Sequence, residues 1–314
     1  MVYSVAWSPE NSLLATGGAG DNIVRLWHFA QDGRRGTCKD TLIGHSEAVT
    51  SVAFHPRLPL LATSSEDKTV KLWSFSYTSS SKATCVETLA VPDEVNSVAF
   101  HPTALIMATG SEDNSVKLWS FLRNGTNAKC VATLAGHSKW VYSVAFHPTA
   151  SLLATGSEDE TAKLWLLSPD NSSAKCVATL AGHSIVVTSV AFHPRLPLLA
   201  TGSADQTAKL WLLSPDNSSA TCVATLAGHS NYVYCVAFHP TAPLLATSSN
   251  DDTVKLWSFL PDGTNANCVA TLAGPGGGVR CVAFDPAITS LHLNLLALGS
   301  ESPNVKIYSI SPVL

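Results

Sequence analysis

The chain has 314 residues, a net charge of −4 and only 13% charged residues. So weak a charge argues against nucleic acid or an anionic membrane as the main partner. The sequence has no run of 18 apolar residues, so we expect no membrane span, and its first residues, MVYSVAWSPENSLL, lack the basic and apolar regions of a secretory signal. We expect a cytoplasmic protein, with a nuclear location as the alternative.

One unit of 46 residues recurs along the whole chain. Residues 152–184 and 198–230 are identical at 30 of 33 positions. A tryptophan marks the same place in six units: Trp27, Trp73, Trp119, Trp165, Trp211 and Trp257. A seventh unit ends on VKIYSI, where the second unit has VKLWSF. Almost no sequence is left over, so we expect a single domain over residues 1–314 made of seven units.

Each unit reads as four short strands. In the second unit these are VTSVAF (49–54), LLATSS (60–65), TVKLWSF (69–75) and CVETL (85–89), separated by turns rich in Pro, Asp, Ser and Gly. Short β-branched runs with such turns predict an all-β fold, and no helical periodicity competes with them. A four-stranded repeat of this length is typical of a blade of a β-propeller.

The segment 136–165, GHSKWVYSVAFHPTASLLATGSEDETAKLW, resembles the WD40 repeat. The resemblance extends over nearly the whole chain and implies a seven-bladed β-propeller of four-stranded antiparallel blades. One feature departs from the family pattern: the tryptophan is followed by His, Ser or Leu, never by the Asp of the Trp-Asp pair.

The resemblance also implies that a hydrogen-bonded tetrad of His, Ser, Asp and Trp holds each blade together. Four units carry all of its members: His45, Ser65, Asp67, Trp73; His137, Ser157, Asp159, Trp165; His183, Ser203, Asp205, Trp211; and His229, Ser249, Asp251, Trp257. The third unit has Val91 in place of His, and the seventh has Pro275 and Tyr308 in place of His and Trp.

These polar residues could be mistaken for catalytic or metal-binding groups. A catalytic triad occurs once in an enzyme, whereas this set recurs at fixed spacing, so we expect no catalytic residues and no enzyme activity. No Cys-x-x-Cys or His-x-x-x-His is present, so we expect no metal site and no cofactor. Six of the eight cysteines recur at one place in the unit, and we expect small buried apolar residues there rather than disulfides.

Function should lie where the copies differ on an exposed face. In the family, the loop after Gly-His and the turn with Asp share the channel-mouth face, which commonly binds peptides. The positions that vary there, and that we predict to bind a partner, are Tyr3, Glu66, Glu94, Glu112, Trp140, Tyr142, Glu158, Tyr232, Tyr234 and Arg280. Aromatic rings beside carboxylates suit a peptide that carries Lys or Arg.

We therefore predict a non-enzymatic interaction scaffold, a monomer within a complex, that docks a protein or peptide on this face. The alternative is a structural propeller module of a larger protein or complex, with no specific peptide site. The chain starts on an inner-strand pattern and ends on a third-strand pattern, so the seventh blade should lack its outer strand. We call the junction of the first and seventh blades the seam, and we expect it to be the least stable part of the ring and a possible docking strip.

Overall fold

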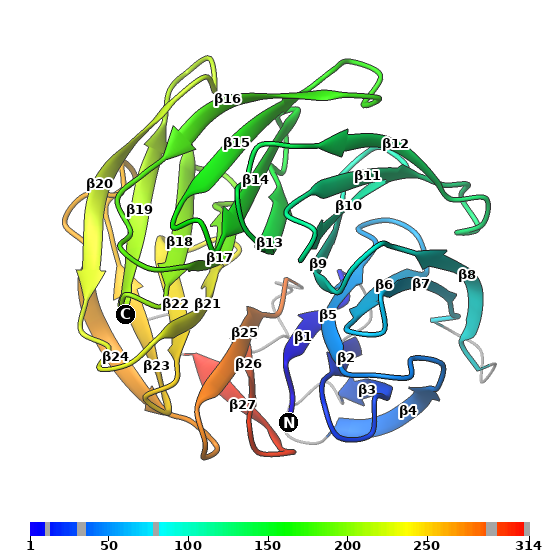
Figure 1. The fold of residues 1–314 in the computed structure, drawn as a ribbon. Helices are drawn as coiled ribbons and strands as arrows, with labels where there is room; N and C mark the ends of the chain where they lie inside the picture. Colours follow the sequence, from blue (N-terminus) through cyan, green and yellow to red (C-terminus); the bar gives the residue numbers. More distant parts are fainter. Residues whose placement is uncertain (10–12, 30–35, 78–81, 287–293, 311–314) are drawn as a thin grey trace.

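The computed structural model describes residues 1–9, 13–29, 36–77, 82–286 and 294–310. In these ranges 27 strands form seven antiparallel sheets, which are the blades of a propeller (Figure 1). Within the same ranges, no helix is long and apolar enough to cross a membrane. The prediction of an all-β propeller with seven blades is confirmed.

Each blade runs in chain order from its inner strand, at the centre of the ring, outward (Figure 1). The inner strands are β1 (Ser4–Trp7), β5 (Val49–Phe54), β9 (Val95–Phe100), β13 (Val141–Phe146), β17 (Val187–Phe192), β21 (Val233–Phe238) and β25 (Val279–Phe284). The second strands are β2 (Leu13–Gly17), β6 (Leu60–Ser65), β10 (Ile106–Ser111), β14 (Leu152–Ser157), β18 (Leu198–Ser203), β22 (Leu244–Ser249) and β26 (Asn294–Ser300).

The third strands carry the repeated tryptophan or its Tyr308 substitute. They are β3 (Val24–Phe29), β7 (Thr69–Ser74), β11 (Val116–Ser120), β15 (Ala162–Leu167), β19 (Thr207–Leu213), β23 (Thr253–Ser258) and β27 (Val305–Ile310). The fourth, outermost strands are β4 (Gly36–Leu42), β8 (Thr84–Ala90), β12 (Lys129–Leu134), β16 (Ala174–Leu180), β20 (Ala220–Ala227) and β24 (Asn267–Ala273). Within the described ranges, the seventh blade is the three-stranded sheet of β25, β26 and β27, as predicted.

The core lies between blades rather than inside one. Seven hydrophobic clusters are found among the described residues, and each joins side chains of two neighbouring blades. Between blades 2 and 3, for example, Leu72 and Leu89 pack in one cluster with Val98 and Trp119. The second strands of blades 1 to 6 are buried along their whole length because a neighbouring blade covers each of their faces. A single unit could not bury these surfaces alone, which explains the repetition.

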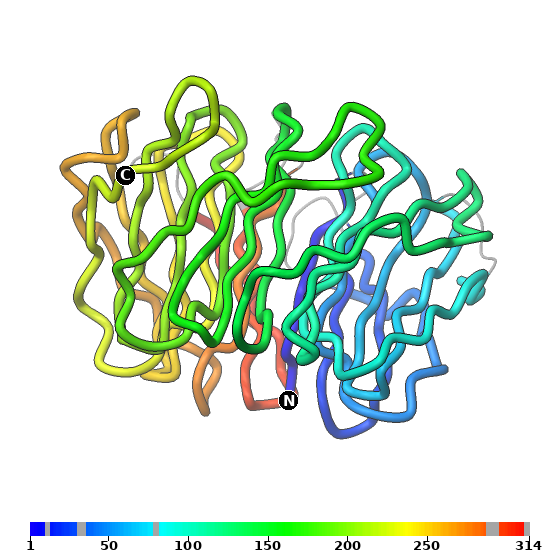
Figure 2. The backbone as a smooth tube through the Cα atoms, turned by 45° about the horizontal axis from the view of Figure 1, so that its top comes forward, coloured from blue at the N-terminus to red at the C-terminus, as the bar shows by residue number. Residues whose placement is uncertain are grey.

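Serine hydroxyls link successive inner strands. The Val52 N–H donates to Ser4 Oγ at 3.1 Å, and the Val144 N–H donates to Ser97 Oγ at 3.2 Å. In blade 6 this serine is replaced by Cys235, whose thiol lies 3.7 Å from the Val282 carbonyl of blade 7. The first and last blades meet at one place in the ring, where the blue and red ends of the chain lie side by side (Figures 1 and 2).

The prediction that the six repeated cysteines are buried was wrong. These residues, which are Cys38, Cys85, Cys130, Cys176, Cys222 and Cys268, are exposed, and all eight cysteines of the chain are unpaired. Each repeated cysteine lies on the outermost strand, opposite the tryptophan where the register shifts, and no further strand covers it there. Cys281, on an inner strand, is the one that is buried.

Candidate functional site at the channel mouth

A hydrogen-bonded chain crosses the top of four blades, and blade 4 shows it clearly. His137 Nδ1 lies 2.8 Å from Asp159 Oδ2, and its Nε2 lies 2.7 Å from Thr155 Oγ1. The indole Nε1–H of Trp165 donates to the same threonine oxygen at 2.9 Å. Blades 2, 5 and 6 repeat these bonds within 0.1 Å.

The chain of bonds fixes the proton on the histidine ring. An ionised carboxylate can only accept, so His137 Nδ1 carries the ring proton and donates it to Asp159. Nε2 of the neutral ring is then an acceptor, so Thr155 donates its proton to Nε2 and accepts from the Trp165 indole. Burial lowers the pKa of His137, although Asp159 opposes this effect, and the ring stays neutral. Burial raises the pKa of Asp159, but bonds from Thr161 and His137 outweigh it and bring the value to about 2.

The hydroxyl in this chain is not the predicted serine, so the assignments of Ser65, Ser157, Ser203 and Ser249 to the tetrads were wrong. Ser65 lies at the end of its strand, where it donates to the Glu47 carbonyl and accepts from the Asp67 N–H. The ring of His45 reaches two residues deeper, to Thr63. The sequence held the signal: a threonine occupies this place in all six units that have the tryptophan, and Leu298 replaces it where Tyr308 replaces the tryptophan.

Blade 3 shows what replaces a missing histidine. Val91 takes the histidine position, and the Lys117 ammonium fills the space with a 2.5 Å ion pair to Asp113. In blade 4 the equivalent Lys163 instead donates to Thr179 on the fourth strand. The bonds of the His, Thr, Asp and Trp side chains thus join the loop, the turn and two strands within each of blades 2, 4, 5 and 6. The residues that differ between blades lie elsewhere on the same face.

Those differing residues form a continuous rim around the channel mouth. In blade after blade, the residue before the turn aspartate donates its backbone N–H to the loop that precedes the inner strand. Three of these bonds join Glu66 to Ala48, Glu112 to Glu94, and Glu158 to Trp140. The residue before the turn and the loop before the inner strand, both of which carry predicted site residues, are thus joined in blades 2 to 7.

Blades 2 and 3 place three carboxylates close together on this rim. They are Glu66, Glu94 and Glu112, all half-buried. Burial raises the pKa of Glu112 to about 6, with further contributions from Glu94, Asp93 and Glu66. Burial also raises the pKa of Glu66, and the negative charges of Glu94 and Glu47 raise it further.

Cations do little to neutralise this cluster. Lys68, on which the charges of Glu94 and Glu112 act, forms its ion pair with Asp93 at 2.9 Å. Among the residues that the structure describes, no ion pair engages Glu66, Glu94 or Glu112. Asn96 donates one hydrogen bond to Glu112. The acid cluster, as we call Glu66, Glu94 and Glu112, therefore lacks a basic partner within the described chain.

An aromatic pair continues the rim in blade 4. The rings of Trp140 and Tyr142 meet edge to face with centroids 6.4 Å apart, and Trp140 is 41% exposed. Burial raises the pKa of Tyr142, and the negative charges of Glu158 and Glu112 raise it further. An exposed indole beside carboxylates offers apolar area and negative potential at one place.

The opposite arc of the rim is already paired. The Arg280 guanidinium lies 4.1 Å from the ring centroid of Tyr234 and 5.8 Å from that of Tyr3. It also forms a 2.6 Å ion pair with Glu301, which the sequence did not identify as a site residue. Tyr232, in the loop directly before β21, lies within electrostatic reach of Tyr234 and is 45% exposed. The structure therefore brings the predicted residues together as two groups, one open and one self-satisfied.

The fold and the recurring tetrads define a WD40 propeller. The family model "WD domain, G-beta repeat" matches residues 1–28, 36–74, 83–120, 128–165, 174–211 and 220–258, so the chain belongs to the WD40 family. Proteins of this family are typically non-enzymatic scaffolds for protein interactions.

Two curated relatives share part of the sequence. The chain is 42% identical over 74 residues to Protein CIA1 of Arabidopsis thaliana, a match that covers 21% of each chain. It is 38% identical over 71 residues to the probable cytosolic iron-sulfur protein assembly protein Ciao1 of Anopheles gambiae, which covers 21% of this chain and 20% of the relative. The chain spans about a fifth of the length of the curated relatives it matches.

Proposed function

We propose that this protein is a non-enzymatic scaffold that binds a Lys- or Arg-bearing segment of a partner protein on the channel-mouth face. The proposal rests chiefly on one observation: the acid cluster of Glu66, Glu94 and Glu112 brings like charges together, and no ion pair in the described ranges engages them. Like charges held close are unfavourable, and a bound cation would relieve that repulsion.

The aromatic pair gives such a segment an anchor. Trp140 and Tyr142 lie next to Glu158, so a cationic side chain could pack on a ring while its charge faces a carboxylate. Exposed Trp and Tyr residues supply much of the energy at protein interfaces. We assign the main contacts to the acid cluster, Glu158 and this pair.

The remaining predicted residues receive a secondary role. Arg280 already covers Tyr3 and Tyr234 and neutralises Glu301, so this group forms the opposite wall of the site. Tyr232 extends the same wall outward. A segment lying across the channel mouth would place its basic residues over blades 2 to 4 and its neutral residues here.

The test uses a random peptide library selected on the immobilised protein. We expect the selected peptides to be enriched in Lys and Arg, and E112Q to weaken their binding by about fivefold, or about 1 kcal/mol. The matched control is E160Q, which removes one exposed carboxylate from the turn of blade 4, outside the cluster. Selected peptides without basic residues, or equal binding by E112Q and wild type, would refute the proposal and favour a structural module with no peptide site.

We further propose a cytoplasmic location and one domain over residues 1–314, with the protein acting as a monomer inside a complex. The name of the mosquito relative, which contains "cytosolic", supports the location. The shared fifth of the length is too short to carry a role in iron-sulfur protein assembly to this chain. Fractionation of cells that express the tagged protein tests the location, and recovery in the organelle pellet would contradict it.

A further inference from the structure

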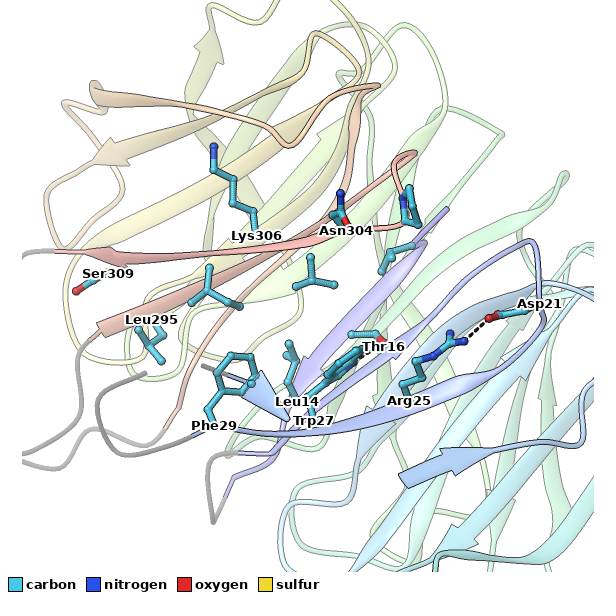
Figure 3. Close-up of a pocket in the computed structure, with 15 residues that line it drawn as sticks. Leu14, Thr16, Asp21, Arg25, Trp27, Phe29, Leu295, Asn304, Lys306 and Ser309 are labelled. Atoms are coloured by element: carbon cyan, nitrogen blue, oxygen red, sulfur yellow. Dashed lines mark hydrogen bonds and ion pairs between the residues drawn. The ribbon is translucent and has the colours of Figure 1, made fainter. Parts of the chain in front are cut away.

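The seam between blades 7 and 1 contains a groove of about 1010 Å³ (Figure 3). One wall is the outer part of blade 7, with Val305 and Ile307 on β27. The other is blade 1, with Leu14, Trp27 and Phe29. In Figure 3 these blade 1 side chains lie on the blue strands, opposite the red strand β27.

The groove lies where a fourth strand lies in every other blade. β27 is the last strand of its three-stranded sheet, so its outer edge pairs with no strand in the described part of the chain. In blade 1, β4 pairs with β3 and places Leu42 opposite Val24. That leucine packs against Trp73 of blade 2. The equivalent leucine is missing at the seam, where the cluster contains no fourth-strand residue.

The exposed fractions of the side chains also show that no fourth strand of the described chain covers the seam. Val24 and Leu26 of β3 are fully buried, whereas the equivalent Val305 and Ile307 of β27 are only partly buried. Trp73 is 3% exposed, whereas Trp27, which faces the seam, is only partly buried. The apolar side chains that a fourth strand would cover are thus present and uncovered.

We propose that this groove binds an extended segment of a partner protein, which adds to β27 as the fourth strand of blade 7. The chain itself specifies the segment. Its own fourth strands share a sequence of mostly uncharged residues, Cys-Val-Ala-Thr-Leu in its commonest form, and end on the leucine that packs against the next blade. The bound segment is antiparallel to β27, with a leucine opposite Val305 and against Trp27.

A second copy of the chain fits this groove poorly. All six fourth strands of the described chain already pair with third strands of their own blades. The other face of β27 is also committed, because Lys306 Nζ and Tyr308 Oη both donate to the Ala273 carbonyl of blade 6, at 3.0 and 2.7 Å. The apolar lining calls for a neutral strand, and the charges at one end, Asp21 and Arg25, pair with each other. This site is separate from the channel-mouth face, so either proposal can fail without the other.

The test uses a fluorescent peptide with the sequence of residues 219–228, SATCVATLAG, with its cysteine replaced by serine. We expect saturable binding in fluorescence anisotropy, and slower hydrogen exchange of residues 305–310 when the peptide is bound. A scrambled peptide, and one with aspartate in place of its leucine, should bind at least about tenfold more weakly.

Protein variants locate the site. V305D should weaken binding at least about tenfold, since it places a charge in the apolar groove. Y308F is the matched control: it removes a bond to blade 6 on the opposite face of β27 and should leave binding unchanged. If circular dichroism shows V305D to be unfolded, V305T replaces it, with an expected loss of about threefold.

Three results would overturn the proposal. The first is no binding of the peptide, and the second is equal binding by the scrambled peptide or by V305D. The third is protection of residues 305–310 that rises with protein concentration alone, together with a dimer in analytical ultracentrifugation, which would make a second copy the occupant.

Discussion

Replacing Thr155 with valine exchanges one hydroxyl for a methyl group. Of all such exchanges in blade 4, this one should lower the free energy of unfolding most. The side chain keeps its size, but the oxygen that joins His137 to Trp165 is lost. Nε2 of His137 and Nε1 of Trp165 then remain buried without a partner, since His137 is 7% exposed and Trp165 is 2% exposed. An unsatisfied buried polar group costs about 1–3 kcal/mol, so T155V should lower the free energy of unfolding by about 4 kcal/mol.

The matched control is S157A, two residues along the same strand. Ser157 bonds only to backbone groups at the rim, the Lys139 carbonyl and the Asp159 N–H, both at 3.1 Å. S157A leaves no buried ring nitrogen without a partner, and the two backbone groups that lose the hydroxyl belong to Lys139, which is exposed, and Asp159, which is partly exposed. S157A should therefore lower the free energy of unfolding by only about 1 kcal/mol. The assay is urea unfolding followed by circular dichroism, with hydrogen exchange to show that the loss is centred on blade 4.

A second measurement isolates the indole. W165F removes the indole N–H, so T155V made in that background leaves only the histidine nitrogen without a partner. The loss of unfolding free energy caused by T155V should then be smaller by about 1–2 kcal/mol. A loss below about 0.5 kcal/mol for T155V, or one smaller than that for S157A, would refute the reasoning.

Three further predictions concern other parts of the ring. Burial, with a smaller effect of Arg195, lowers the pKa of His193 to about 4. Because the pKa of this histidine is higher in the unfolded chain, its contribution to stability is full above about pH 6.5 and is lost as the pH falls. Between pH 7.5 and 5, the free energy of unfolding measured in urea should therefore fall by about 2 kcal/mol less for H193N than for wild type. Equal losses would contradict this. K117M should reduce stability by about 1–2 kcal/mol, because it removes the cation paired with Asp113 and leaves that carboxylate only its bonds from Ser115. K163M, at the equivalent place in blade 4, should change stability by less than about 0.5 kcal/mol, and similar effects of the two substitutions would show that Lys117 does not replace the histidine. Hydrogen exchange should be faster in β3 and β27 than in β15 and β19, since the seam lacks a covering strand, and uniform protection would rule out a weak seam.

The sequence alone was enough to determine the ring. A 46-residue period, four strand-length runs in each unit and turn residues between them leave few folds open. The three-stranded seventh blade followed from the same count, because the last unit matches the others only as far as its third strand. These features depend on local patterns repeated many times, so each copy supports the assignment of the next.

Only the tertiary structure decided which side chains meet. It showed that the imidazole of His45 reaches Thr63 rather than Ser65. How far this side chain extends between the strands depends on the path of the loop that carries it. It showed that the repeated cysteines face outward, since no layer lies beyond the fourth strand.

The rim depended on tertiary structure in the same way. In the sequence Glu112 and Glu301 occupy equivalent places, yet the first lies among other carboxylates and the second is paired with Arg280. What a rim residue meets depends on the loops of its own blade as well as those of the adjacent blade: Arg280 pairs with Glu301 inside blade 7, whereas Glu66 of blade 2 lies near Glu94 and Glu112 of blade 3. The repeat therefore determines the scaffold, and the packing of these loops determines which rim charges find an ion-pair partner.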